Sequence, residues 1–78
     1  MESPNTLIIF YDVAVGKEPL LAAIAQYNAT VVYDLNNMNS IVVRIPDETK
    51  IDEAIEFFNG VNGVLQVNRD RAIEIDTF

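Results

Sequence analysis

The stretch that decides the fold is Thr30–Pro46, TVVYDLNNMNSIVVRIP, in which two β-type runs flank an asparagine-rich segment. Thr30–Tyr33 and Ser40–Ile45 are rich in β-branched and aromatic residues, a composition typical of strands. Asparagine tolerates a left-handed backbone and bonds locally, so Leu35–Asn39 is predicted to be a turn. Pro46 ends the second run, because proline cannot donate to a strand ladder. The stretch therefore predicts a β-hairpin.

The segment before this hairpin has helical character. Glu18-Pro19 is a suitable start, because proline at the first turn loses no needed hydrogen bond. Asn28 is a plausible end. One apolar face is expected from the spacing, made by Leu20, Leu21, Ile24 and Tyr27.

The segment after the hairpin predicts a second amphipathic helix. Its start chemistry lies at Asp47–Thr49, where Thr49 and Asp52 resemble a capping pair, and Asn59-Gly60 is expected to end it. The acidic residues Asp52, Glu53 and Glu56 fall on the opposite, solvated face. The apolar stripe repeats at helical spacing through Ile51, Ala54, Ile55 and Phe58.

Two outer β-type runs, Leu7–Tyr11 and Val64–Val67, complete the order β-α-β-β-α-β. This order favours an α+β, ferredoxin-like sandwich with a four-stranded antiparallel sheet and both helices on one face. A more irregular two-layer fold or a swapped dimer are the alternatives. We expect a flexible N-terminus over residues 1–5, a domain over 6–71 and a C-terminal tail over 72–78.

Composition restricts the chemistry. The 78 residues include 12 acidic and 5 basic side chains, giving a net charge of −7, which disfavours nucleic acid or an anionic membrane as partner. The sequence has no Cys and no His, which removes thiolate and imidazole catalysis and the usual transition-metal ligands. We therefore expect that this chain is not an enzyme and that it binds neither a metal nor a cofactor. No signal peptide is recognisable, which indicates a cytoplasmic chain, or an extracellular one if it is cut from a precursor.

Alternation along the strands predicts which side chains face the helices. In the Ser40–Ile45 run Ile41, Val43 and Ile45 point inward, and in the Val64–Val67 run Leu65 and Val67 do so. The opposite, open face would then carry apolar side chains, which in a small domain usually marks a contact surface. That surface could serve a homodimer, could be partly covered at an edge, or could dock on another protein. Its expected apolar members are Ile8, Phe10, Val42 and Val64, with Gln66 and Asn68 beside them.

The C-terminal residues Ala72–Phe78 are extended in character and end on an aromatic side chain. They could form a final edge strand of the same sheet. They could equally add to a partner through backbone hydrogen bonds and side-chain pockets.

The hairpin Val31–Pro46, the first run Leu7–Tyr11 and the segment Gly63–Asp70 resemble the corresponding parts of subtilisin propeptides and the free-standing inhibitors related to them. The resemblance covers about residues 6–76 and rests on patterns, not on a signature. It implies the same β-α-β-β-α-β fold. It also implies a subtilisin-like serine protease as partner, bound as a heterodimer by a chain that is a monomer when free.

In that family the open sheet face packs on two protease helices, and an acidic cluster after the fourth strand caps their N-termini. Asp70 matches one carboxylate of this cluster, whereas Asn68 and Arg69 replace acidic residues. The family's tail lies in the substrate cleft as a product-like strand. Here the tail residues in that role would be Ile73, Ile75, Asp76, Thr77 and Phe78.

Two registers of the tail are open. If the chain end occupies the cleft, Phe78 fills the first specificity pocket and Ile75 the fourth. If the register has no gap, Asp76 and Ile73 take those places, and an aspartate fits an apolar pocket poorly.

The resulting expectation is a protease inhibitor or folding chaperone. The second alternative is a ferredoxin-like regulatory or small-molecule-binding domain that dimerises through its sheet. A purely structural domain is a third alternative.

Overall fold

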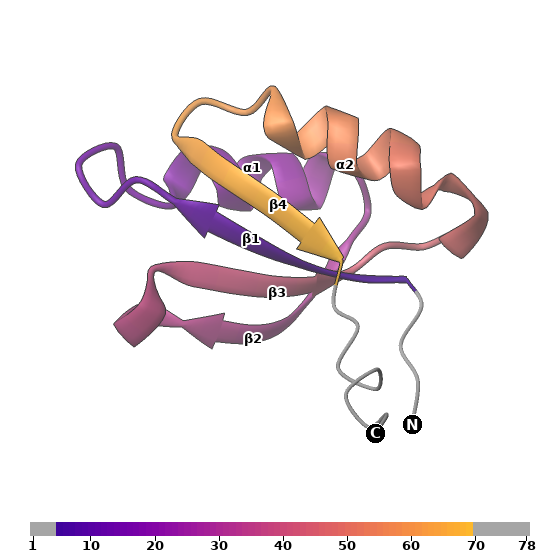
Figure 1. The fold of residues 1–78 in the computed structure, drawn as a ribbon, viewed down its shortest axis with the longest axis horizontal. Helices are drawn as coiled ribbons and strands as arrows, with labels where there is room; N and C mark the ends of the chain where they lie inside the picture. The colour runs from indigo at the N-terminus through magenta and orange to yellow at the C-terminus, as the bar shows by residue number, and fades with distance from the viewer. Residues whose placement is uncertain (1–4, 70–78) are drawn as a thin grey trace, which may run out of the picture.

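The sheet is built from four antiparallel strands in the spatial order β2-β3-β1-β4, and this computed structural model describes residues 5–69. The order along the chain is the predicted β-α-β-β-α-β, and the fold is the α+β, ferredoxin-like one that the sequence predicts (Figure 1). The elements are β1 (Thr6–Tyr11), α1 (Glu18–Gln26), β2 (Thr30–Leu35), β3 (Ser40–Arg44), α2 (Ile51–Asn59) and β4 (Val64–Arg69).

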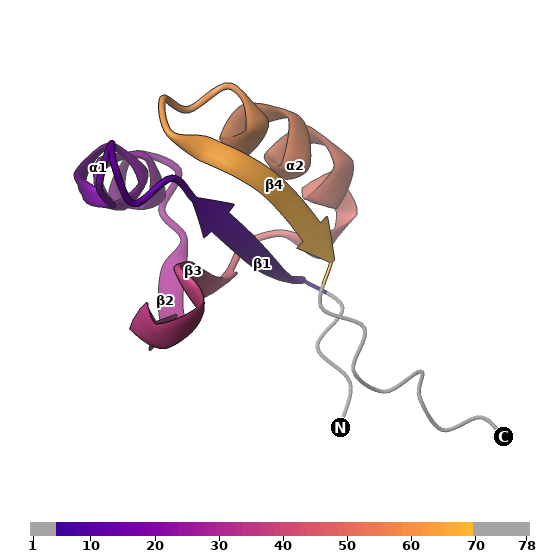
Figure 2. The ribbon, with the colours of Figure 1, turned by 60° about the vertical axis from the view of Figure 1, so that its left-hand side comes forward.

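Both helices cover the same side of the sheet, as Figures 1 and 2 show from two directions. The core lies between the two helices and the sheet, and the inward side chains of β1 and β3 form part of it. The predicted inward residues Ile41 and Val43 of β3, and Ile45 directly after it, are at most 1% exposed. Within residues 5–69, no helix is long and apolar enough to cross a membrane.

The helix α1 starts where the sequence predicts, with Pro19 in its first turn, but its buried face is rotated. Leu20 and Ile24 are buried, and Ala23 is buried with them. Leu21, expected on this face, is 39% exposed, so that part of the prediction is wrong. Ala23 and Ile24 lie three and four residues after Leu20 and therefore share its face of the helix. Leu21 lies one residue after Leu20 and points away from that face.

The helix α2 buries the predicted stripe: Ile51, Ala54 and Phe58 are buried and Ile55 is half-buried. The predicted capping pair is absent from its start, because Thr49 lies in the short 3₁₀ turn Glu48–Lys50. Asp47 caps that turn instead. Its Oδ1 accepts hydrogen bonds from the Thr49 backbone N–H at 3.0 Å and from the Thr49 hydroxyl at 2.7 Å.

The hairpin between β2 and β3 turns through a short 3₁₀ segment, Asn36–Met38, and the left-handed Asn39 with φ 53°. Asn28 ends α1 with φ 62°. Both confirm that asparagine supplies the left-handed positions. Asn5, which the sequence placed in the flexible start, bonds to Ile45 through its backbone carbonyl and its side-chain amide. The rest of that start lies outside the described residues.

Candidate functional site

The face of the sheet turned away from the helices is the main candidate site. Alternation from the paired residues places Ile8 and Phe10 of β1 on it, because their neighbours Leu7 and Ile9 are fully buried on the helix side. Val42 lies directly opposite Ile8 on β3. These three predicted members of the surface therefore share one face.

Tyr33 extends this apolar surface onto the edge strand β2. It lies opposite Val42, and its side chain is 63% exposed whereas Val42 is 5% exposed. Tyr33 is not among the residues that the sequence predicts for this face, because the register of β2 slips at Val32, between the Val31 and Tyr33 pairings. A bulge of this kind redirects every following side chain of the strand. We call Ile8, Phe10, Tyr33 and Val42 the apolar strip.

Polar side chains border the strip on the opposite edge strand, β4. Gln66 lies opposite Phe10 and Asn68 opposite Ile8, so both are on the open face as predicted. The Gln66 side-chain amide donates a hydrogen bond of 3.2 Å to Asn68 Oδ1. These two amides offer both donors and acceptors to a partner.

The expected place of Val64 on the open face is wrong. Val64 is half-buried, lies opposite Tyr11 and packs against the core, and the pairing of β4 shifts between Phe10 and Tyr11. Leu65 is left unpaired at this bulge and is 66% exposed, although alternation predicted it inward. An extra residue in one strand inverts the side-chain pattern beyond it, which a local pattern does not reveal.

Two hydroxyls flank the strip. Thr6 Oγ1 and Ser40 Oγ are buried and have no hydrogen-bond partner among the described residues. Ser40 lies opposite Phe10 and Thr6 opposite Arg44. A buried hydroxyl that lacks a hydrogen-bond partner costs free energy.

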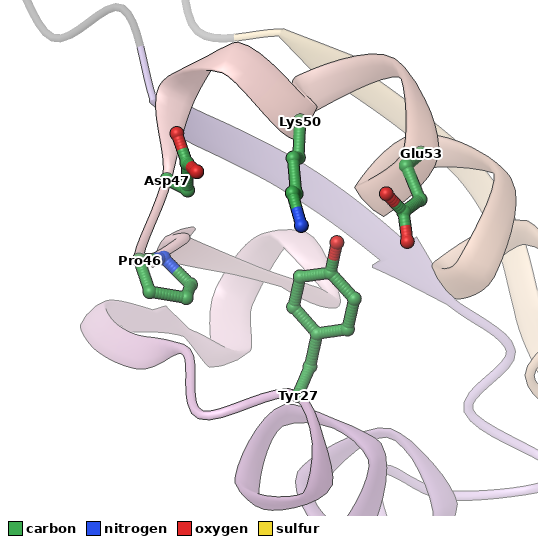
Figure 3. A pocket seen from close by; sticks show the side chains of 5 residues that line it. All are labelled: Tyr27, Pro46, Asp47, Lys50 and Glu53. Atoms are coloured by element: carbon green, nitrogen blue, oxygen red, sulfur yellow. The ribbon is translucent and has the colours of Figure 1, made fainter.

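A second candidate is an open pocket of about 240 Å³ where the end of α1 meets the start of α2 (Figure 3). Tyr27 forms its aromatic wall and stacks on Phe57 with ring centroids 4.9 Å apart. Burial raises the pKa of the Tyr27 hydroxyl, and the carboxylates of Glu53 and Asp47 raise it further. The lining residues are Tyr27, Pro46, Asp47, Lys50 and Glu53.

The charges around this pocket are exposed. Hydrogen bonds from Thr49 lower the pKa of the Asp47 carboxyl, and the nearby Lys50 lowers it further. Asp47, Lys50 and Glu53 are all open to solvent, so water screens them from one another and from a ligand. The pocket combines an aromatic wall with hydrated charges, a weaker arrangement for binding than a desolvated one.

The acidic face of α2 is solvated, as expected: Asp52, Glu53 and Glu56 are exposed. Within residues 5–69, no group of three acidic side chains is arranged to hold a metal ion. One exposed ion pair joins the start of α1 to β2, where Lys17 Nζ lies 2.7 Å from both Asp34 Oδ2 and Asn36 Oδ1. The Asp34 hydrogen bond is the main cause that raises the Lys17 pKa.

The expected cleft-binding residues Ile73, Ile75, Asp76, Thr77 and Phe78, and the carboxylate of Asp70, lie outside the described residues. Comparisons with protein-family models, with curated proteins and with solved structures each found no match.

Proposed function

We propose that this chain is a non-enzymatic inhibitor or folding chaperone of a subtilisin-like serine protease. It docks through its open sheet face and inserts its C-terminal residues in the substrate cleft as a product-like strand. The observation that carries the proposal is the apolar strip, which lies on the face that neither helix covers.

The strip has the composition of a protein contact surface. Its most exposed member is Tyr33, at the end of the strip on the edge strand β2, and aromatic side chains are enriched among the residues that dominate binding energy. Gln66 and Asn68 border it with amides that can pair with backbone groups of a partner. An apolar centre with a polar rim is the usual anatomy of a stable interface.

The place of β4 in the sheet fits the insertion of a tail. It is an edge strand, and Arg69 is its last residue. Residues that follow therefore start from the border of the docking face, not from its middle. A chain leaving from that border can continue into a neighbouring protein while the sheet face stays in contact.

The test is inhibition of subtilisin in a peptide-hydrolysis assay, with the full chain and a chain lacking Asp76–Phe78. The full chain should inhibit competitively, and the shortened chain should be at least about tenfold weaker, or about 1.4 kcal/mol. Equal potency of the two chains would rule out occupation of the cleft by the tail.

A matched pair of substitutions tests the docking face. Tyr33→Ser removes an exposed aromatic side chain from the apolar strip, and Leu21→Ser removes an exposed apolar one from the helical side. Both should remain folded by circular dichroism, because both side chains are exposed. Only Tyr33→Ser should weaken inhibition, by about tenfold. Equal effects of the two variants would contradict docking through the sheet face.

Light scattering separates this proposal from a domain that dimerises through its sheet. The proposed inhibitor is a monomer when free. A dimer that dissociates in the Tyr33→Ser variant, together with absent inhibition, would favour the dimeric regulatory domain instead.

A further inference from the structure

The tripeptide Asn-Gly-Val occurs twice in succession, at residues 59–61 and 62–64. These are the two places in the sequence where glycine follows asparagine. Asparagine is a chemically labile side chain, and a following glycine has no Cβ to shield its backbone nitrogen. Because the two tripeptides are identical, any difference in their reactivity in the folded protein comes from structure.

The first asparagine is held by a helix. Asn59 is the last residue of α2, and the backbone nitrogen of Gly60 donates a hydrogen bond of 3.2 Å to the Phe57 carbonyl. The next nitrogen, of Val61, donates to the Phe58 carbonyl at 3.0 Å. The Gly60 nitrogen is therefore engaged, and the backbone on both sides of it is fixed.

The second asparagine lies in an exposed turn. The Val64 nitrogen donates to the Val61 carbonyl at 3.1 Å, which closes a four-residue turn with Asn62 and Gly63 at its centre. Gly63 has φ 89°, the position that a type II turn reserves for glycine. Among the hydrogen bonds of residues 5–69, none uses the Gly63 nitrogen as donor.

We propose that Asn62 is a site of spontaneous deamidation in the folded protein and that Asn59 is protected. The Gly63 backbone nitrogen forms a bond to Asn62 Cγ, and the Cγ–Nδ2 bond breaks. The side-chain nitrogen leaves as ammonia with the proton that the Gly63 nitrogen gives up. The new bond closes a five-membered succinimide ring. Solvent water then adds to either carbonyl of this ring and opens it to aspartate or isoaspartate, without oxidation or reduction.

The reaction would alter the turn that positions β4. The Gly63 carbonyl accepts a hydrogen bond of 2.7 Å from the Asp12 nitrogen, which joins this turn to the end of β1. Isoaspartate adds a backbone carbon at residue 62, and either product adds one negative charge, taking the net charge from −7 to −8. Because β4 follows the turn directly, the modification would act on the strand that carries Gln66 and Asn68.

The test is peptide mapping by mass spectrometry of the full chain, aged in mildly alkaline buffer, natively and in denaturant. In the folded chain Asn62 should convert at least about tenfold faster than Asn59, equivalent to about 1.4 kcal/mol in activation free energy. In denaturant the two rates should converge. Asn62→Gln should remove the fast native reaction, and the matched Asn59→Gln should leave it.

Three results would overturn the proposal: a native rate ratio equal to the denatured one, a faster native reaction at Asn59, or no native reaction at Asn62. None of these results depends on protease binding. The experiment therefore tests the deamidation of Asn62 independently of the proposed function.

Discussion

Gly63→Ala should destabilise the domain through two separable effects. The backbone at Gly63 has φ 89°, where an L-residue costs about 1–2 kcal/mol. A Cβ there would also lie 2.8 Å from Val15 Cγ1 and 3.0 Å from Val15 Cβ, which forces the loop after β1 to move. Overpacking of this kind adds about 1 kcal/mol or more. The expected loss is therefore about 2–4 kcal/mol in the free energy of unfolding.

A double-mutant cycle separates the two effects. Val15 is 39% exposed, so Val15→Ala alone should change stability by no more than about 0.5 kcal/mol. In the double variant the contact with Val15 Cγ1 is removed, so part of the steric cost should be recovered. The 3.0 Å contact with the Cβ that alanine keeps and the backbone cost should remain, giving a coupling energy of up to about 1 kcal/mol. Urea unfolding followed by circular dichroism measures all four corners of the cycle.

Gly60→Ala is the matched control. Gly60 has φ −86°, and its nearest added contact would be the Phe57 carbonyl oxygen at 3.5 Å. Alanine fits there without strain and should be neutral or stabilising by about 0.4–1 kcal/mol. A Gly63→Ala variant as stable as the parent, or a Gly60→Ala variant equally damaged, would refute the reasoning.

Three further outcomes are expected. Ser40→Ala should leave stability unchanged or raise it by up to about 1 kcal/mol in urea unfolding, because it removes a buried hydroxyl without a partner; a clear loss would contradict this. Thr49→Val should raise the Asp47 pKa towards its ordinary 3.8, followed by NMR titration. Since folding lowers that pKa, the Asp47 carboxylate contributes to stability above about pH 3.8, and this contribution is lost as pH falls through the folded value. The loss should be larger in the parent than in Thr49→Val, because the parent has the larger pKa shift. Glu53→Gln should lower the Tyr27 pKa, seen as earlier phenolate absorbance, and an unchanged titration would show that Glu53 does not act on the ring.

The open face could be predicted in part because its members on β1 and β3 belong to regular strands. There alternation alone puts Ile8, Phe10 and Val42 opposite the buried residues. The tail lies outside the described residues, so its role stays a prediction from resemblance.

The sequence by itself determined the element order, the hairpin, the start of α1 and the residues that end both helices. These follow from local chemistry: Pro19 suits a first helical turn, Asn28 and Asn39 accept a left-handed backbone, and the stripe ending at Phe58 has helical spacing. Each signal acts over a few residues, so it can be read without knowing what packs against it.

Only the tertiary structure decided which face of the sheet the side chains of the two edge strands, β2 and β4, point to. The bulges at Val32 and Leu65 depend on how each edge strand pairs with its inner neighbour. They turn Tyr33 onto the open face and turn Val64 towards the core. A one-residue slip reverses the face of every side chain beyond it, and the contacts that favour the slip come from strands distant in sequence.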